Sequence, residues 1–194
     1  MKNILLICFV LFCGNSCKQY PANESHILIE TVSGDIVLQL YPDKAPKTVA
    51  AFLKYIAAGH YKESNFYRVL KNENVPAEYN TGLIQGGIFH SNPSLHQQLK
   101  GTEHESPRQT GLSHTNGTIS MARSTPGSAT AEFFICIGDQ QQFDSSRRTG
   151  SDGLGYAAFG KVVEGMDVVL KIQNKKSNGE NFVDRLRIIN IRKL

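Results

Sequence analysis

The sequence predicts a mainly β fold, a closed antiparallel barrel capped by two α-helices. Two observations lead to this prediction. Short apolar runs of strand-like pattern dominate the chain, and only two stretches show helical spacing, far apart in the sequence. So many strands would leave exposed sheet edges unless the sheet closed on itself, which favours a barrel. The 194 residues suffice for one domain with a sizeable core, and no internal repeat or domain break is visible.

The first elements are a hairpin and a helix. The run HILIETVSGDIVLQLY, residues 26–41, alternates apolar and polar residues on both sides of a turn at Gly34, which predicts two paired strands. In the following run, PDKAPKTVAAFLKYIAAGHY, Pro46 suits a first helical turn and Gly59 suits the left-handed position that ends a helix. The apolar residues between them recur at helical spacing: Val49, Phe52, Leu53 and Ile56.

The remaining elements are strands and one further helix. We expect strands at residues 66–70, 83–85, 118–123, 132–137, 156–163 and 186–191, and a helix at 166–172. The polar stretches 92–112 and 139–155 are expected to be long loops. Another polar run, 71–82, separates the strand that carries Arg68 from the strand that carries Gln85. Antiparallel pairing would bring these two side chains together whatever the length of the run, since closure entropy grows only with the logarithm of loop length.

The first residues form a segment apart from the fold. MKNILLICFVLFCGNSCKQ has a positive charge at Lys2 and then an apolar run too short to span a bilayer as a helix, which is typical of a secretory signal. Small and polar residues follow and lead to Cys17. The segment therefore resembles a bacterial lipoprotein signal, and the resemblance implies cleavage before Cys17 and lipid attachment to its thiol. An ordinary signal peptide cut elsewhere and an uncleaved anchor are the alternatives.

The predicted organisation is a signal at residues 1–17, a tether at 18–25 and one domain at 26–194. We expect a monomer in the cell envelope, on the periplasmic side or at the cell surface, which contacts the membrane only through its lipid anchor. The formal net charge of +4 is mild and the basic residues are scattered. A nucleic-acid-binding protein would be expected to show a stronger basic stripe, so we expect no nucleic-acid partner.

Cysteine and histidine usage indicates neither a nucleophile nor a metal site. Cys136 is the one cysteine beyond the signal region and lies in the apolar run FFICI with no basic neighbour, so we expect a buried, unreactive thiol. The spacings of the histidines fit no compact ligand motif, and we interpret their segment as a solvated loop. These histidines are His90, His96, His104 and His114.

Five segments, in order and at family-like intervals, resemble the cyclophilins, which are peptidyl-prolyl cis-trans isomerases. They are FYRV, LIQGG, GTISMAR, SATAEFFICI and GLGYAAFGKVVEGMDVV, and the opening hairpin and helix fit the same family. The resemblance covers residues 27–194 and is greater to the bacterial branch than to the eukaryotic one. It implies an eight-stranded barrel with a helix over each open end. It also implies isomerisation of Xaa-Pro bonds in proline-containing polypeptides during folding, without a metal or cofactor.

The chemistry of prolyl rotation explains the importance of one arginine. The barrier of about 18–20 kcal/mol arises from the loss of amide resonance as the peptide bond twists. At the twisted geometry the proline nitrogen becomes pyramidal and gains a lone pair. A charged donor aimed at that nitrogen stabilises the twisted state and not the planar one. By resemblance, Arg68 in FYRV is the catalytic arginine; taken alone, it would more simply be an arginine paired with a carboxylate.

The other site residues are assigned by the same resemblance. Gln85 would hydrogen-bond the substrate backbone, since an amide both donates and accepts, although a buried structural hydrogen bond is the alternative role. Adjacent Phe133 and Phe134 face opposite sides of a strand, which leaves open which of them faces the groove. The resemblance selects Phe134 as the apolar floor for the proline ring. Leu83, Met121 and Phe143 are the expected walls, Tyr156 takes the place of the family's pocket histidine, and Ala122 and Arg123 would offer backbone groups.

The chain also departs from the family pattern. Gly82 holds the place of a second pocket phenylalanine, Gln142 that of the aromatic residue that contacts cyclosporin, and Glu132 that of a usual glutamine. We expect the 71–81 run to project beside the groove, where Tyr79 could replace the missing aromatic wall. Two other functions stay open at this point: a proline-peptide-binding module with weak or no isomerase activity, and a structural envelope protein in which Arg68 and Gln85 diverge in space.

Overall fold

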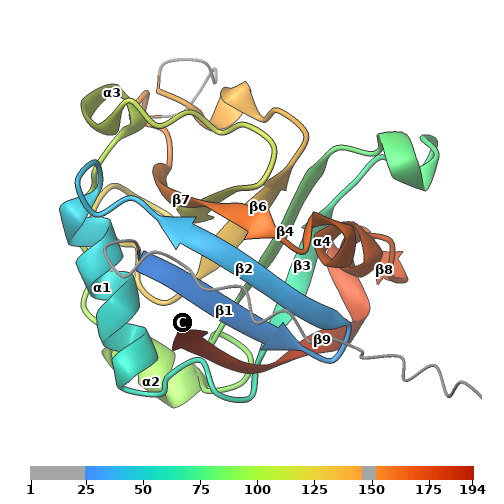
Figure 1. The fold of residues 1–194 in the computed structure, drawn as a ribbon, viewed down its shortest axis with the longest axis horizontal. Helices are drawn as coiled ribbons and strands as arrows, with labels where there is room; N and C mark the ends of the chain where they lie inside the picture. Colours follow the sequence, from blue (N-terminus) through green and yellow to red (C-terminus); the bar gives the residue numbers. More distant parts are fainter. Residues whose placement is uncertain (1–24, 146–151) are drawn as a thin grey trace, which may run out of the picture.

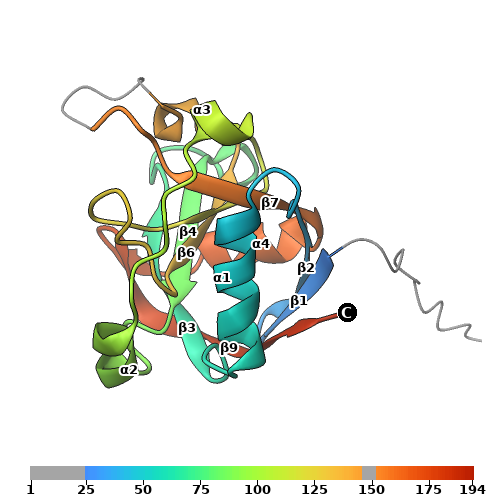
Figure 2. The same cartoon turned by 90° about the vertical axis from the view of Figure 1, so that its left-hand side faces the viewer.

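The computed structural model describes residues 25–145 and 152–194, so the predicted signal, Cys17 and almost all of the tether lie outside the described residues. Within them the chain forms a barrel of antiparallel strands, with helices on its outside (Figures 1 and 2). The barrel strands are β1 (Ser25–Thr31), β2 (Gly34–Leu40), β3 (Ser64–Leu70), β4 (Gly82–Gly87), β5 (Thr118–Met121), β6 (Phe133–Ile137), β7 (Ala157–Glu164) and β9 (Asn181–Lys193).

The strand order confirms the closed barrel. The described sheet runs β1-β2-β7-β5-β6-β4-β3-β9, and the pairing of β1 with β9 closes it. A short extra strand, β8 (Ser177–Asn178), pairs only with β9 and forms a small hairpin outside the barrel. The sequence prediction missed β8 and most of the first half of β9, because polar and charged residues alternate there without a clear apolar run.

Two longer helices cover opposite sides of the barrel, as predicted. In Figure 1, α1 (Pro46–Ala57) lies to the left of the strands and α4 (Met166–Gln173) to the right. Pro46 begins α1, and the buried face of this helix packs Val49 and Phe52 into the core. Two shorter helices, α2 (Pro93–Gln98) and α3 (Pro107–Thr110), lie in the stretch that was expected to be loop throughout.

The long connection between β4 and β5 is anchored by one buried carboxylate. Glu105 accepts hydrogen bonds from the backbone N–H groups of Lys47 and Thr48 at the start of α1, at 3.1 and 2.8 Å, and from the Thr48 hydroxyl at 2.7 Å. The first N–H groups of a helix have no partner within the helix and attract negative charge. Glu105 therefore fixes this connection against the barrel.

Aromatic side chains fill the barrel interior. Phe133 packs edge-on against Phe52, Tyr61 and Phe66, with ring centroids 5.7–5.9 Å apart. Its neighbour Phe134 belongs to a separate small cluster on the outer face of the same strands. The expected alternation is therefore confirmed, and β6 contributes one phenylalanine to the core and one to the outer face.

Candidate active site

The strands β3 and β4 place Arg68 and Gln85 opposite each other. The two strands pair antiparallel with Arg68 in register with Gln85. The Arg68 Nη1 donates a hydrogen bond to the Gln85 Oε1 at 2.8 Å. The prediction that strand pairing would bring these residues together is confirmed, and the structural alternative, in which they diverge, is wrong.

An irregularity in β3 adds a third residue to this pair. The register shifts between Phe66 and Arg68, which leaves Tyr67 as an extra residue in the strand. A bulge of this kind interrupts the alternation of side chains, so consecutive residues can act on the same side. The Tyr67 hydroxyl accepts a hydrogen bond from the Gln85 Nε2 at 2.7 Å, and Gln85 is therefore held from both ends of its amide. Sequence reasoning missed Tyr67 because it assumed regular alternation.

The other side of the Arg68 guanidinium is held by Glu180. The Arg68 Nε and Nη2 donate to the Glu180 Oε2 at 2.9 and 2.6 Å. Glu180 lies in the turn between β8 and β9, so it reaches Arg68 from far along the chain. Both side chains are substantially exposed, so the ion pair adds little to fold stability and acts mainly on the orientation of the guanidinium.

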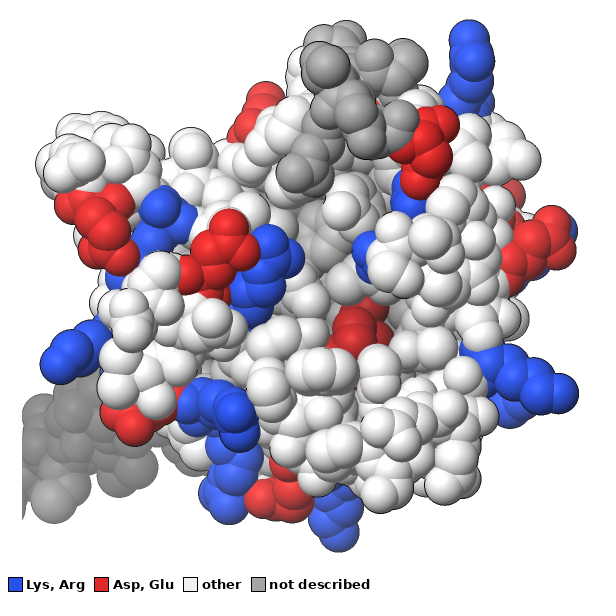
Figure 3. Space-filling model, turned by 180° about the vertical axis from the view of Figure 1, so that it is seen from behind, with Lys and Arg blue, Asp and Glu red and all other residues white. Residues whose placement is uncertain are grey.

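Arg68 and Gln85 lie in a groove of about 940 Å³ on the outer face of the barrel. The face turned away from the viewer in Figure 1 is hollowed near its centre, with basic and acidic side chains interspersed (Figure 3). Six further predicted site residues line the groove: Leu83, Ala122, Arg123, Phe134, Phe143 and Tyr156. The groove thus collects in one place residues from β3, β4, β6 and the segments that follow β5 and β6.

One predicted wall residue is wrong. Met121 is 1% exposed, belongs to the barrel core and does not line the groove. The reason is the register of β5 against β6, where Met121 pairs with the core residue Phe133 and Ser120 pairs with Phe134. Side chains alternate along a strand, so Met121 follows Phe133 into the interior.

The floor of the groove is an aromatic cluster around Phe134. Its ring centroid lies 5.5 Å from that of Phe143 and 5.4 Å from that of Tyr156, both in edge-on contact. The Arg123 guanidinium lies over the Tyr156 ring at 5.3 Å and donates to the Asp152 carboxylate and to the Gly155 carbonyl. Arg123 therefore fixes Tyr156 through its side chain, whereas the sequence had suggested only its backbone groups.

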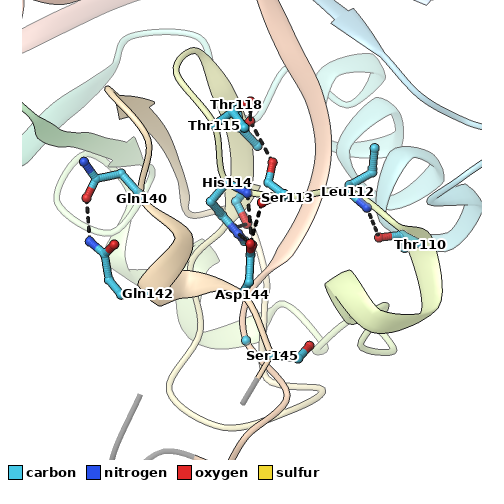
Figure 4. A network of polar contacts seen from close by, with 12 residues as sticks. Thr110, Leu112, Ser113, His114, Thr115, Thr118, Gln140, Gln142, Asp144 and Ser145 are labelled. Atoms are coloured by element: carbon cyan, nitrogen blue, oxygen red, sulfur yellow. Dashed lines mark hydrogen bonds and ion pairs between the residues drawn. The ribbon is translucent and has the colours of Figure 1, made fainter. Parts of the chain in front are cut away.

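A buried histidine supports Phe134 from behind. The His114 ring stacks on Phe134 with an interplanar angle of 13° and ring centroids 5.8 Å apart. Figure 4 shows Asp144 beside His114 and Ser113, with the His114 Nδ1 2.7 Å from the Asp144 Oδ1. On the other side the His114 Nε2 lies 3.0 Å from the Ser120 Oγ. His114 is fully buried, so its assignment to a solvated loop was wrong.

The charges around His114 favour a neutral ring. Burial lowers the pKa of His114, and this effect exceeds the opposite effect of the Asp144 carboxylate. Partial burial raises the pKa of Asp144, but the hydrogen bonds from Ser113 and His114 outweigh it and hold that pKa below its usual value. Nδ1 therefore carries the proton toward Asp144, and Nε2 accepts from Ser120.

Across the described residues, no group of three or more His, Cys, Asp or Glu side chains could hold a metal ion.

A buried acid, Glu132, also lines the groove. Its Oε2 accepts from the Tyr67 hydroxyl at 2.8 Å, and its Oε1 accepts from the backbone N–H groups of Ile88 and Phe89 at 2.7 and 2.9 Å. Burial raises the pKa of Glu132 to about 7, although the three hydrogen bonds oppose this shift. Burial and the adjacent Glu132 raise the pKa of the Tyr67 hydroxyl as well, so Tyr67 stays protonated.

Comparison with known proteins decides the family. The family model described as "Cyclophilin type peptidyl-prolyl cis-trans isomerase/CLD" matches residues 26–193. This chain belongs to the cyclophilins. It is 38% identical over 154 residues to peptidyl-prolyl cis-trans isomerase cyp18 of Streptomyces antibioticus, covering 79% of this chain and 86% of that protein. It is 39% identical over 148 residues to peptidyl-prolyl cis-trans isomerase B of Escherichia coli K12, covering 76% and 83% of the two chains.

Solved cyclophilin structures agree on the fold. A cyclophilin-type isomerase from Cryptosporidium parvum superposes with a TM-score of 0.68 at 22% identity, covering 88% of this chain and 98% of that one. A second structure of that protein, determined in the presence of the dipeptide Ala-Pro, gives a TM-score of 0.67 at 23% identity. Family and fold together show a cyclophilin-type peptidyl-prolyl cis-trans isomerase.

The backbone at Gly82, which by resemblance holds the place of a second pocket phenylalanine, leaves no room for a side chain. Gly82 has φ of +136°, and a Cβ atom there would lie 2.0 Å from the Leu70 carbonyl oxygen. A phenylalanine at this position would therefore require a different backbone conformation. Gln142, at the place of the aromatic residue that contacts cyclosporin in the family, lines the groove, and its amide donates to the Gln140 side chain at 2.6 Å (Figure 4).

The 71–81 insertion of this cyclophilin does not complete the pocket. It folds on itself around Asn80, whose side chain accepts from the Asn72 N–H and donates to the Asn72 carbonyl, both at 2.8 Å. Tyr79, in the short 3₁₀ turn η1 (Ala77–Tyr79), is 73% exposed and does not line the groove. The idea that Tyr79 replaces the missing aromatic wall is therefore wrong.

The thiol of Cys136 behaves as predicted. It is fully buried in β6, and burial raises its pKa above the usual range. A thiol with a raised pKa carries little thiolate at neutral pH, and the thiolate is the reactive form. Cys136 is therefore a small apolar residue that packs in the Phe134 cluster.

Proposed function

We propose that this cyclophilin accelerates the rotation of Xaa-Pro bonds in the groove between Arg68, Gln85 and Phe134. The observation that supports it is the convergence of these three residues on one cavity, with the guanidinium beside an apolar aromatic floor. The proline ring would rest on Phe134, and Gln85 would hydrogen-bond the peptide backbone. The Ala-Pro dipeptide named with the Cryptosporidium structure is consistent with a proline ligand for this fold.

Arg68 provides the hydrogen-bond donor that stabilises the twisted peptide bond and not the planar one. In the described structure, Nε, one N–H of Nη1 and one N–H of Nη2 donate to Gln85 and Glu180. A guanidinium carries five N–H groups, so one N–H on each Nη is left for the substrate. Such a donor, held in place before the substrate arrives, stabilises the lone pair that forms on the proline nitrogen as the bond twists. No covalent bond is made or broken.

Exchange spectroscopy on a short Xaa-Pro peptide separates this function from simple peptide binding. With a catalytic amount of protein, we expect exchange cross-peaks between the cis and trans proline resonances at mixing times where the free peptide shows none. A binding module would shift the peptide resonances without adding exchange. Shifts without exchange would therefore reject the catalytic role and retain the groove.

We also infer that the chain is exported and held at a membrane by lipid on Cys17, so that it acts on proteins that fold in the cell envelope. The support is the sequence of residues 1–17, with its positive start, short apolar run and small residues before the cysteine. Within the described residues, no helix is long and apolar enough to cross a membrane. One acyl chain alone anchors a protein only weakly, so stable attachment would require the several chains that a lipoprotein carries.

Replacing Cys17 by serine tests this anchor. In cells that process lipoproteins, we expect the wild type to sediment with membranes and to incorporate a radiolabelled fatty acid. We expect Cys17→Ser to lose the label and to leave the membrane fraction, while a Cys136→Ser control keeps both properties because its thiol is buried in the domain. Label on Cys17→Ser equal to that on the wild type would contradict the proposal.

A further inference from the structure

We propose that Glu132 and Tyr67 are positioning residues that fix the orientation of the Gln85 amide toward Arg68. The four side chains form a directed chain of hydrogen bonds, here called the relay: Arg68 to Gln85, Gln85 to Tyr67, Tyr67 to Glu132. The inference rests on the proposed roles of Arg68 and Gln85. It extends them by naming what decides which end of the Gln85 side chain faces the arginine.

The direction of the relay follows from the donors and acceptors that each group has. An ionised carboxylate only accepts, so the Tyr67 hydroxyl must point its proton at Glu132. The Tyr67 oxygen is then an acceptor toward Gln85, and the amide must turn its Nε2 to Tyr67 and its Oε1 to Arg68. Arg68 has no acceptor and could not bond the Nε2 of a flipped amide.

Glu132 is the final acceptor of the relay and sets its direction, because three donors converge on it. The Ile88 and Phe89 N–H groups occupy its Oε1, and the Tyr67 hydroxyl occupies its Oε2. A carboxylate satisfies all three donors, whereas an amide has only one accepting atom. If glutamine replaced Glu132, its oxygen would take the two backbone donors, and its NH₂ would face the Tyr67 oxygen as a further donor. Tyr67 would then turn its proton toward Gln85 and favour the flipped amide.

Kinetics of three variants test this reasoning. We expect Glu132→Gln to lower kcat/KM on an Xaa-Pro peptide by about 10-fold or more, since it drives Gln85 the wrong way, and Tyr67→Phe to lower it by about 3-fold, since it only removes support. Adding Tyr67→Phe to Glu132→Gln should restore activity to the level of Tyr67→Phe alone, because the misdirected hydroxyl is gone. A purely structural role predicts that the two losses multiply, and that result would overturn the proposal.

Tyr61→Phe is a matched control. Tyr61 is also a buried tyrosine whose ionisation is opposed by the charge of Glu132, but in the described structure its hydroxyl has no hydrogen-bond partner. It lies in the barrel core and outside the relay, so we expect Tyr61→Phe to keep wild-type kcat/KM. A loss equal to that of Tyr67→Phe would show that any buried hydroxyl near Glu132 matters, and it would contradict the relay.

The pH dependence of kcat/KM gives a further test, because a purely structural role of Glu132 would not change it. Because the pKa of Glu132 is raised to about 7, lowering the pH through neutrality protonates it, and its Oε2 then becomes a donor toward Tyr67. We expect kcat/KM of the wild type to fall below about pH 7 and this step to vanish in Glu132→Gln. Among the described residues, the other titratable or charged groups near Glu132 and Tyr67 are Tyr61, Arg68, His90 and His96.

Two of these groups are histidines and need their own control. His90 packs edge-on against Tyr67, and His96 lines the groove. The double variant His90→Asn/His96→Asn should retain the step in the pH profile if Glu132 causes it. A step that persists in Glu132→Gln, or disappears with the two histidines, would assign the step to a histidine and overturn the role of Glu132 in it.

A measurement without substrate separates failure of the relay from failure of the catalytic role. The side-chain NH₂ resonances of Gln85 should shift with pH in the wild type and should lose that shift in Tyr67→Phe, since the hydroxyl links Gln85 to Glu132. If the wild type does not accelerate prolyl exchange, the proposed function fails, but this shift would still report the relay. If Gln85 shows no shift while exchange is fast, the relay is wrong and the function stands.

Discussion

Replacing Arg68 by alanine is expected to lower kcat/KM for an Xaa-Pro peptide by about 100- to 1,000-fold, the usual effect of removing one preorganised donor from a developing charge. The guanidinium is the charged donor beside the apolar floor, and its orientation is set in advance by Gln85 and Glu180. The side chain of Arg68 is 37% exposed, so its removal leaves no cavity in the core and the fold should persist. Exchange kinetics together with thermal unfolding measure both effects.

Two milder variants show which property of Arg68 matters. Arg68→Lys keeps the charge but not the fork that bonds Gln85 and Glu180 at once, so we expect it to recover only a small part of the lost activity. Glu180→Gln keeps the arginine and weakens its exposed ion pair, so we expect a loss of a few-fold at most. Wild-type activity in Arg68→Ala would contradict the role of the guanidinium. A loss in Glu180→Gln as large as that in Arg68→Ala would shift the main role to the ion pair.

The adjacent residues Phe133 and Phe134 are expected to give opposite results. Phe133→Ala removes a ring that contacts Phe52, Tyr61 and Phe66 inside the barrel, and should lower the free energy of unfolding by about 3–5 kcal/mol. Phe134→Ala removes the floor of the groove and should lower kcat/KM by about 10- to 100-fold, because the proline ring loses its apolar contact. Denaturant unfolding and peptide kinetics on the same samples separate these effects.

Two leucine variants serve as a control in case the alanine variants do not fold. Phe133→Leu and Phe134→Leu keep apolar volume at each position, so both proteins should fold. We expect Phe133→Leu to lose stability with nearly unchanged kcat/KM, and Phe134→Leu to lose activity more than Phe133→Leu does. Equal activity losses in the two leucine variants would contradict the assignment of one ring to the core and the other to the groove.

The barrel and the proximity of Arg68 to Gln85 could be predicted from the sequence because both depend on the pairing of regular strands. Antiparallel pairing of the two strands is expected to bring Arg68 near Gln85 whatever the loop length, and the structure confirms that they come together, directly opposite each other. The resemblance selects Phe134 for the groove, and alternation along β6 then places Phe133 in the core, as the structure confirms. Strand alternation therefore predicts that adjacent side chains lie on opposite faces, and the resemblance predicts which face forms the groove.

Prediction failed where direction depends on irregular or distant structure. Tyr67 joins the site only because a bulge interrupts the alternation of β3, and a bulge leaves no clear mark in the sequence. Glu180 reaches Arg68 from a turn that no local pattern connects to the groove. Met121 was misplaced because its side of the strand depends on the register between β5 and β6. His114, in a polar stretch, is buried by partners distant in the sequence.

The cis-trans exchange rate of a short Xaa-Pro peptide tests the central claim most directly, that one groove holds the proline on Phe134 and aims Arg68 at its nitrogen. The measurement compares exchange NMR of the peptide alone with exchange in the presence of catalytic amounts of the wild type and of Arg68→Ala. With the wild type, we predict an exchange rate that rises in proportion to the protein concentration. With Arg68→Ala, we predict a rate near the uncatalysed one, which corresponds to a time of about tens to hundreds of seconds per rotation. An unchanged rate with the wild type, or an equal acceleration by both proteins, would contradict the claim.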